Sequence, residues 1–361
     1  MVRSNAMTAH VAHEPVPAVR GAAGAEVVTL HAGELRAEVL THGAHLVGLW
    51  SPDRDGHLDN LVCSLRDPSG RPDLARYTDP VANPHLGSIV GRVANRVGGA
   101  SIPLEGRRVQ LEPNEGRHQL HGGPVGIDRH VWSIRDSGTD PRTAMAFVRL
   151  VHVSPDGDQG YPGRLELVAT YTLDPGGLRL EVEARSDRTT VVGLTHHGYW
   201  NLAGADDPTG AVDRLGRHRL RVAADRFVVV DDELIPTGEL RPVTGTVFDL
   251  RDGVELSGLL GGVDLDATGG IDHCLVLGPS RELAAELVDP VSGRRLELRT
   301  DQVGLQVYAS NHGAGNLPRH GAVCLEPQSW PDSPNHAGFP DLTLRPGEMR
   351  RWWLDLRLGL D

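Results

Sequence analysis

The chain has 361 residues, of which 39% are hydrophobic and 23% charged, so it is long enough to bury a large core. Its formal net charge is −12, and an acidic balance without basic clusters argues against nucleic acid or an anionic membrane as a partner. No apolar run reaches the ~18–20 residues that a membrane-spanning helix needs. The three cysteines, Cys63, Cys274 and Cys324, are far apart and odd in number. We therefore expect no disulfide framework and a cytoplasmic location.

The N-terminal segment differs in composition from the rest of the chain. Residues 1–6 resemble the remnant of an expression tag, with Met7 as the native start. Residues 7–23 are rich in Ala, Pro, His and Val and show no periodicity, which predicts a flexible leader. Because no linker or repeat divides the remainder of the chain, residues 24–361 are predicted to form a single domain.

Apolar and polar residues alternate with a period of two along most of the chain from Glu26 onward, as in β-strands. The clearest pair is Arg164–Leu173 and Leu178–Arg185, joined by a Pro-Gly turn. A second hairpin is predicted over Ala100–Leu111, and Val254–Leu260 is a candidate for a short helical turn. Many strands with little helix predict an all-β fold, an antiparallel sandwich or barrel.

Two glycine-flanked polar clusters lie early in the chain, Gly91–Arg96 and Leu120–Gly123. The hairpin predicted between them takes the chain out and back, so the clusters can meet at one end of a sheet. Asn95, Arg96 and His121 would then face one ligand. Neutral hydrogen-bonding groups beside a fixed cation suit a polyhydroxylated molecule, in which each hydroxyl needs a directed partner. Two unrelated surface turns remain the alternative interpretation.

Two later clusters hold groups that can transfer protons near neutral pH. His196 and His197 are adjacent on a predicted strand, so at most one of them faces a given site. Glu326 follows the apolar strand Ala322–Leu325 and precedes a proline-rich loop. Partial desolvation there would raise its pKa and make it a better base. Taken alone, a histidine of this pair could be an ordinary core residue, and Glu326 could be an ordinary carboxylate at the end of a strand.

Two weaker signals are Asp272, just before the strand Cys274–Leu277, and Gln306, inside the strand Gly304–Ser310. The histidine pairs His42/His45 and His118/His121 lack an HExxH motif or a cysteine pair, so we expect no metal site. Glycine-rich phosphate-binding motifs are also missing, and no nucleotide cofactor is expected.

Taken together and in this order, the segments resemble the aldose 1-epimerase (galactose mutarotase) family. The resemblance covers about residues 26–358. It rests on seven segments that are unspecific singly but specific in this order: Gly91–Arg96, Leu120–Gly123, His197–Leu202, Ile235–Gly238, Gly270–His273, Gln306–Tyr308 and Leu325–Asn335. The resemblance implies a large antiparallel β supersandwich with few short helical turns.

The resemblance also implies an isomerase without a cofactor, which interconverts the α and β anomers of an aldohexose such as galactose or glucose. By position, Glu326 is the base that removes the proton from the C1 hydroxyl, and His197 is the acid that protonates the ring oxygen. The ring opens, the C1–C2 bond rotates, and the ring closes on the other carbonyl face. His121 would bind on the ring-oxygen side. The residues expected to hold sugar hydroxyls are Asn95, Arg96, Asp272 and Gln306. The expected partner is therefore a small monosaccharide, bound by a monomer or homodimer.

Three residues depart from the family pattern. Gly198 replaces a small hydroxyl residue, Trp200 replaces phenylalanine, and Pro327 replaces threonine. We expect these departures to reshape the pocket near C6 or C4 and to alter the preferred sugar, with the proton transfers unchanged. Arg92, in the first cluster, is expected to have a structural role.

Three other functions stay open. The first is a sugar-binding or sensor protein on the same fold that does not catalyse a reaction. The second is an epimerase that acts on a sugar phosphate, which would need further arginines such as Arg92, Arg117 and Arg129. The third is a glycoside hydrolase, which would need two carboxylates, and Glu326 with Asp272 is the available pair.

Overall fold

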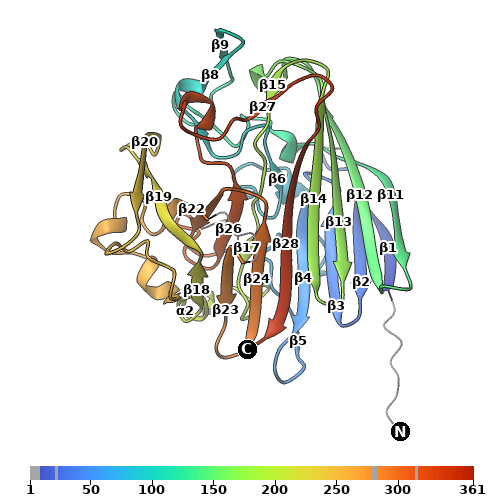
Figure 1. The fold of residues 1–361 in the computed structure, drawn as a ribbon. Coiled ribbons are helices and arrows are strands. Elements are labelled where there is room, and N and C mark those ends of the chain that lie inside the picture. The colour runs from blue at the N-terminus through green and yellow to red at the C-terminus, as the bar shows by residue number, and fades with distance from the viewer. Residues whose placement is uncertain (1–8, 21–22, 279–282, 314–315) are drawn as a thin grey trace.

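The computed structural model describes residues 9–20, 23–278, 283–313 and 316–361, and most of its regular secondary structure is strand (Figure 1). The helices in these ranges are short: α1 (Leu74–Tyr77) and α2 (Ala211–Gly216). Neighbouring strands pair in antiparallel register. The predicted all-β fold class is therefore confirmed.

Three sheets carry the architecture. The first has five strands, in the order β1 (Ala9–Val16), β2 (Ala25–Ala32), β3 (Leu35–Leu40), β4 (His45–Pro52) and β5 (Leu58–Asn60). The second has nine strands, in the order β11 (Ser133–Asp140), β12 (Met145–Ser154), β13 (Leu165–Asp174), β14 (Gly177–Ser186), β28 (Arg350–Leu360), β24 (Arg294–Thr300), β23 (Ala285–Val288), β18 (Arg219–Val222) and β21 (Val254–Glu255). The third has six strands, in the order β17 (Tyr199–Trp200), β26 (Val323–Gln328), β25 (Gly304–Tyr308), β22 (Asp272–Leu277), β19 (Ala224–Val230) and β20 (Pro236–Pro242).

Eight further strands form short two-stranded ladders. They are β10 (Gln119–Leu120) with β7 (Arg96–Val97), β8 (Ser101–Leu104) with β9 (Arg107–Gln110), β15 (Thr190–Val191) with β27 (Thr343–Leu344), and β16 (Thr195–His196) with β6 (Ile89–Val90). The pair β8 and β9 is the hairpin predicted over Ala100–Leu111, which is confirmed.

Strict alternation explains why these segments form strands. In β13 every second side chain, from Leu165 to Leu173, is buried, and β14 pairs with β13 in antiparallel register across the predicted turn. The buried face of β12 and β13 packs against β2 and β3, which forms a sandwich (Figure 1). The same hydrophobic core continues into the six-stranded sheet, where Leu305, Val307 and Leu325 are buried.

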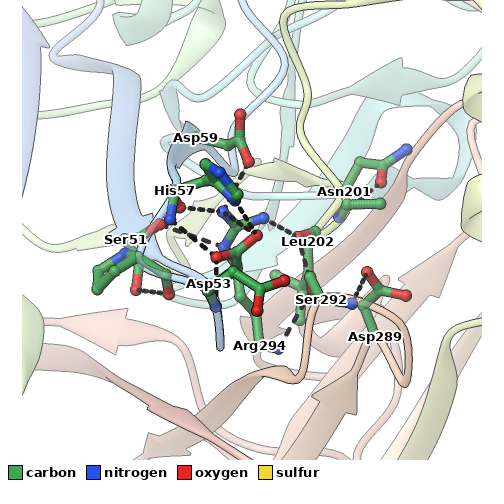
Figure 2. Close-up of polar contacts among 12 residues, drawn as sticks. Ser51, Asp53, His57, Asp59, Asn201, Leu202, Asp289, Ser292 and Arg294 are labelled. Carbon is green, nitrogen blue, oxygen red and sulfur yellow. Dashed lines mark hydrogen bonds and ion pairs between the residues drawn. The ribbon is translucent and has the colours of Figure 1, made fainter.

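A buried cation joins two of the sheets at the end of the sandwich. Arg294, on β24, is 2% exposed and donates hydrogen bonds to the backbone oxygens of Ser51, His57 and Leu202 (Figure 2). It also pairs with the Asp59 carboxylate at 2.6 Å. Because a buried guanidinium needs partners for its N–H groups, this network fixes the β4–β5 hairpin against the nine-stranded sheet.

The structure corrects the expectation of a flexible leader over residues 7–23. Ala9–Val16 forms β1, which pairs with β2 along its whole length, from Ala9 opposite Ala32 to Val16 opposite Ala25. Backbone hydrogen bonds to the neighbouring strand stabilise β1, although the local sequence pattern does not predict a strand there. Residues 1–6, interpreted as a tag remnant, lie outside the described residues.

Three smaller expectations can also be compared with the structure. Val254–Leu260 contains a short 3₁₀ turn, Leu256–Leu259, after the two residues of β21. The thiols of Cys63, Cys274 and Cys324 are free and buried. Among the described residues, no helix combines the length and apolar character needed to cross a membrane.

Candidate active site

A cavity of about 280 Å³ opens beside the six-stranded sheet. All seven residues predicted for the site line it, although they come from distant parts of the chain: Asn95, Arg96, His121, His197, Asp272, Gln306 and Glu326. The structure therefore brings the early binding clusters and the later proton-transfer clusters together in one place.

The two early clusters meet through backbone pairing. Arg96 on β7 lies opposite Leu120 on β10, and the His121 amide donates to the Asn95 carbonyl at 3.1 Å. Gly122 allows this close approach, because a Cβ there would lie 1.9 Å from the Gly91 oxygen. Its positive φ of 89° also favours glycine. The predicted meeting of the two clusters is confirmed.

The hydrogen bond to its ring determines how His121 faces the cavity. The Asn95 amide donates to His121 Nδ1 at 3.2 Å, so Nδ1 is an acceptor and the proton lies on Nε2. Burial lowers the pKa of His121 well below its usual value, and the nearby His85 and His197 lower it further. His121 is therefore a neutral ring with an Nε2–H group available as a donor.

Arg96 is not a free cation, because it forms a two-pronged ion pair with Glu115. Its Nε lies 2.7 Å and its second terminal nitrogen 2.8 Å from the two Glu115 oxygens. The Arg96 amide also donates to the Asn95 side chain at 2.8 Å. Glu115 lines the cavity and was not predicted from the sequence. The pair holds the guanidinium in a fixed orientation.

On β25 and β26, successive side chains point to opposite faces of the sheet, so one face lines the cavity and the other packs in the core. Leu305 and Val307 on β25 belong to the core, whereas Gln306 lines the cavity directly opposite Glu326 on β26. Gln306 Nε2 donates to Asp272 Oδ1 at 2.6 Å, while Gln306 Oε1 and Glu326 Oε2 are buried without a partner among the described residues. Buried polar atoms without partners indicate that a polar ligand completes the site.

His197 and Glu326 form the proton-transfer pair of the cavity. His197 Nε2 lies 3.6 Å from Glu326 Oε1, and both side chains are almost fully buried. Burial raises the pKa of Glu326 well above its usual value, and the charge of Asp272 raises it further. Burial lowers the pKa of His197, as does the neighbouring His85. Both shifts disfavour the charged form of the group, so they reduce the usual excess of the imidazole's proton affinity over that of the carboxylate.

The adjacent His196 faces away from the cavity, as predicted for neighbours on a strand. It is 1% exposed, and burial lowers its pKa to about 4. Its ring lies 6.4 Å from that of Tyr171, in the interior. Both adjacent histidines are buried.

His121, His197 and Glu326 each offer a ligand atom within 4.8 Å of the others, which raises the question of a metal ion. The donor set does not fit one well. Nδ1 of His121 already accepts the Asn95 amide, so its cavity-facing Nε2 carries a proton and has no lone pair for a metal. In the second such group, Asp53, Asp55 and His57, the Asp53 carboxylate lies 4.0 Å from the Arg294 cation, and the His57 carbonyl accepts from it (Figure 2).

The three departures from the family pattern do not line the cavity, which corrects the expectation that they reshape it directly. Trp200 is 1% exposed in the core, and a Cβ on Gly198 would lie 2.9 Å from its ring. The Pro327 carbonyl accepts hydrogen bonds from Thr195 and Trp352. Gly198 therefore makes room for the indole, and the two departures are sterically linked.

The arginines considered for a phosphate group lie elsewhere. Arg92 is 2% exposed and donates to the Ser154 side chain and to the backbone oxygens of residues 154, 155 and 162, in agreement with a structural role. Arg117 pairs with Glu233, and Arg129 pairs with Asp128. Among the described residues, only Arg96 brings a guanidinium to the cavity lining.

Sequence reasoning missed His85, which also lines the cavity. Its ring lies 4.7 Å from that of His121 and 5.9 Å from that of His197. His85 follows Pro84 in a loop without periodicity, and its hydrogen-bonding partner, Asp128, is 43 positions away. Only the proximity of this loop to the first cluster could have pointed to it.

Comparisons with known proteins agree with this geometry. The family model described as aldose 1-epimerase matches residues 26–357. Galactose mutarotase from Sus scrofa is 37% identical over 338 residues, which cover 91% of this chain and 92% of the relative. Aldose 1-epimerase from Haemophilus influenzae is 36% identical over 266 residues, which cover 71% of this chain and 75% of the relative.

Solved structures extend the similarity to the whole fold. The crystal structure of galactose 1-epimerase from Lactobacillus acidophilus has a TM-score of 0.84 at 28% identity and covers 98% of this chain and 99% of that one. An aldose epimerase homologue from C. elegans has a TM-score of 0.79 at 28% identity, covering 97% and 99%. The chain therefore belongs to the aldose 1-epimerase family.

Proposed function

We propose that this protein is an aldose 1-epimerase that interconverts the α and β anomers of an aldohexose such as galactose or glucose. The observation that carries the proposal is the buried pair of His197 and Glu326, 3.6 Å apart in a cavity lined with hydrogen-bonding side chains. Membership of the family and the names of the relatives, galactose mutarotase and aldose 1-epimerase, support the same reaction.

In the proposed reaction the pair carries one proton throughout. The Glu326 carboxylate takes the proton from the C1 hydroxyl while the His197 imidazolium gives its proton to the ring oxygen, and the C1–O5 bond breaks. The open-chain aldehyde rotates about C1–C2. The O5 hydroxyl then attacks the other carbonyl face, His197 takes back its proton, and Glu326 returns one to O1.

The opposed pKa shifts support this exchange. A raised pKa on Glu326 and a lowered pKa on His197 reduce the usual preference of such a pair for the ionic one-proton arrangement over the neutral one. Ring opening in one direction and closure in the other can then use the same two groups. No step in this scheme requires a cofactor or a metal.

The remaining polar groups are proposed to hold the sugar. His121 donates through Nε2–H on the ring-oxygen side, and the hydroxyls are held by Asn95, Arg96, Asp272 and Gln306. The Gln306 oxygen, buried and unpartnered among the described residues, supports this role. The Arg96–Glu115 ion pair argues against a sugar phosphate, because the guanidinium already has a carboxylate partner.

We also infer a cytoplasmic monomer or homodimer with no nucleic-acid or membrane partner. The three free, buried thiols support a reducing compartment, and the net charge of −12 supports the absence of polyanionic partners.

The test is polarimetry of freshly dissolved α-D-galactose and α-D-glucose, followed by other aldoses and the 6-phosphates. We expect the protein to accelerate the approach to the equilibrium rotation for free hexoses, with a lower kcat/KM for the 6-phosphates. Binding without acceleration would favour a non-catalytic sugar sensor. Faster conversion of the 6-phosphates than of free hexoses would favour the sugar-phosphate epimerase.

A further inference from the structure

His85 is held rigidly beside the proton-transfer histidine. The Gly87 amide donates to the His197 carbonyl at 2.8 Å, and the His197 amide donates to the Ser88 carbonyl at 2.9 Å. Both the amide and the hydroxyl of Ser88 donate to the His85 carbonyl. The loop that carries His85 is therefore hydrogen-bonded to both the carbonyl and the amide of His197. These bonds fix the positions of the two rings relative to each other.

The loop is also fixed from behind. Gly87 has a φ of 76°, its carbonyl accepts from the Leu46 amide at 2.8 Å, and a Cβ on it would lie 2.2 Å from the Leu46 oxygen. The Asn83 side chain accepts from the Leu86 amide and donates to the Tyr77 carbonyl. His85 itself has a positive φ of 66°, a conformation that costs free energy for a residue other than glycine and is concentrated at functional sites.

A buried carboxylate orients the His85 ring. His85 Nδ1 lies 2.9 Å from Asp128 Oδ2, and Asp128 is 1% exposed. The same Asp128 oxygen forms an ion pair with Arg129, whose Nε lies 3.0 Å away. A carboxylate only accepts, so Nδ1 of His85 carries the proton and, in the neutral ring, Nε2 presents a lone pair.

His85 and His121 therefore present opposite hydrogen-bonding edges within one cavity. His121 offers Nε2–H, because its Nδ1 accepts a backbone amide, whereas the neutral tautomer of His85 set by Asp128 offers Nε2 as an acceptor. The His85 side chain is 16% exposed, and its Nε2 has no hydrogen-bond partner among the described residues. A sugar hydroxyl both donates and accepts, so a site with one donor ring and one acceptor ring 4.7 Å apart matches its chemistry.

We propose that His85 is a further sugar-binding residue of this site, which accepts a hydrogen bond from one hydroxyl of the aldose through Nε2, with Asp128 as the residue that positions its ring. This inference rests on the proposed function, because it assumes that the cavity takes a free aldose. It adds a specificity determinant, since only a sugar with a hydroxyl at that place and orientation makes the contact. A neutral hydrogen bond of this kind changes affinity by about 3- to 10-fold.

The test compares D-galactose with its 2-, 3-, 4- and 6-deoxy analogues, by KM in polarimetry and by Kd in calorimetry. In the wild-type protein one deoxy analogue is expected to lose about 3- to 10-fold because of the missing contact. In the His85→Phe variant, removal of the hydroxyl at that position is expected to cause no further loss of affinity. The losses caused by removing hydroxyls at the other positions should persist. The deoxyfluoro analogue of that position should bind as poorly as the deoxy analogue, because fluorine cannot donate to Nε2.

Two further variants guard against an indirect effect. His85→Asn suits a positive φ and is expected to behave as His85→Phe does. Asp128→Asn keeps an acceptor for His85 Nδ1, so the affinity loss for that one deoxy analogue should remain. Asp128→Ala removes the acceptor and should abolish that loss. Melting temperatures are recorded for both variants. The matched control is His57→Phe, because His57 also lies beside a carboxylate, Asp53 at 3.4 Å, but is 76% exposed in the Arg294 region (Figure 2).

The outcomes are distinct. If removing each hydroxyl costs the His85→Phe variant as much affinity as it costs the wild type, His85 makes no contact with a hydroxyl and the inference is wrong. Persistence of binding by the deoxyfluoro analogue would assign His85 as a donor and also overturn it. If the wild-type protein neither binds nor converts these sugars, the proposed function itself fails.

Discussion

At the scale of single residues, Glu326 illustrates how burial prepares a carboxyl group for proton transfer. Exposed glutamates are ionised at neutral pH and are weak bases. Here burial raises the pKa, and the Asp272 charge adds to that effect. Asp272 is in turn held by Gln306 at 2.6 Å, so the second carboxylate has a fixed place next to the first. Asp272 thus affects the pKa of the base, in addition to the contact with the sugar that we propose for it.

Replacing Asp272 with Asn is expected to shift the pH profile of kcat to lower pH. Removing a negative charge near Glu326 lowers the pKa of that carboxyl group, so the pair loses its proton at lower pH. The expected shift is on the order of one pH unit. Polarimetric rates between pH 4 and 9 measure it, with Asp136→Asn as the control, because Asp136 on β11 is exposed, pairs with Arg149 and does not line the cavity. A profile that does not move would mean that Asp272 leaves the base unaffected.

Gly198 and Trp200 form a second residue-scale pair, in the core next to the site. A serine at position 198 would place its Cβ 2.9 Å from the indole and 3.0 Å from the His196 ring. We expect Gly198→Ser to lower the free energy of unfolding by about 1–3 kcal/mol through overpacking. In a Trp200→Phe background the same change should cost at least about 1 kcal/mol less. Urea unfolding of the four proteins measures this coupling, and additive effects would contradict the steric link.

At the scale of elements, alternation on strands places the site. One face of β25 and β26 carries Leu305, Val307 and Leu325 into the core, and the other face carries Gln306 and Glu326 into the cavity. Because the strand period is two, a shift of register by one residue would exchange the two faces. The active site is therefore the polar face of a sheet whose apolar face helps to hold the fold together.

The same local periodicity explains what the sequence predicts well. The hairpin of β13 and β14 is predictable almost to the residue, because strict alternation and a Pro-Gly turn are both local signals. β1 could not be predicted in the same way, since its strand conformation depends on pairing with β2. The seven site residues follow from motifs, whereas His85, Asp128 and Glu115 enter the site or its support through contacts between segments far apart in the chain.

Deletion of residues 1–16 tests the structural role of β1. Losing this strand exposes the hydrogen-bonding edge of β2 and the core residues against which Ala9 and Val11 pack. We expect the melting temperature to fall by about 2–6 °C and self-association to increase. Calorimetry and size-exclusion chromatography measure the two effects. An unchanged melting temperature and elution volume would show that β1 contributes nothing to the domain.

At the scale of the whole molecule, one continuous hydrophobic core supports three sheets, and the cavity lies beside the six-stranded sheet that carries Glu326. Residues from 85 to 326 converge on it, so the site exists only in the assembled fold. A large β scaffold of this kind keeps the proton-transfer pair and the hydroxyl-binding groups at fixed distances, which is the condition for acid–base catalysis by positioned groups.

The proposed reaction depends on proton exchange between the anomeric centre and the pair of Glu326 and His197. It is tested most directly by measuring kcat for the mutarotation of α-D-galactose by the wild-type protein, Glu326→Gln and His197→Asn, with folding checked by circular dichroism. A positioned acid or base contributes about 10²–10⁴-fold, so each substitution is expected to lower kcat by that factor while the protein stays folded and still binds the sugar. Near-wild-type turnover by a folded Glu326→Gln protein would contradict the account.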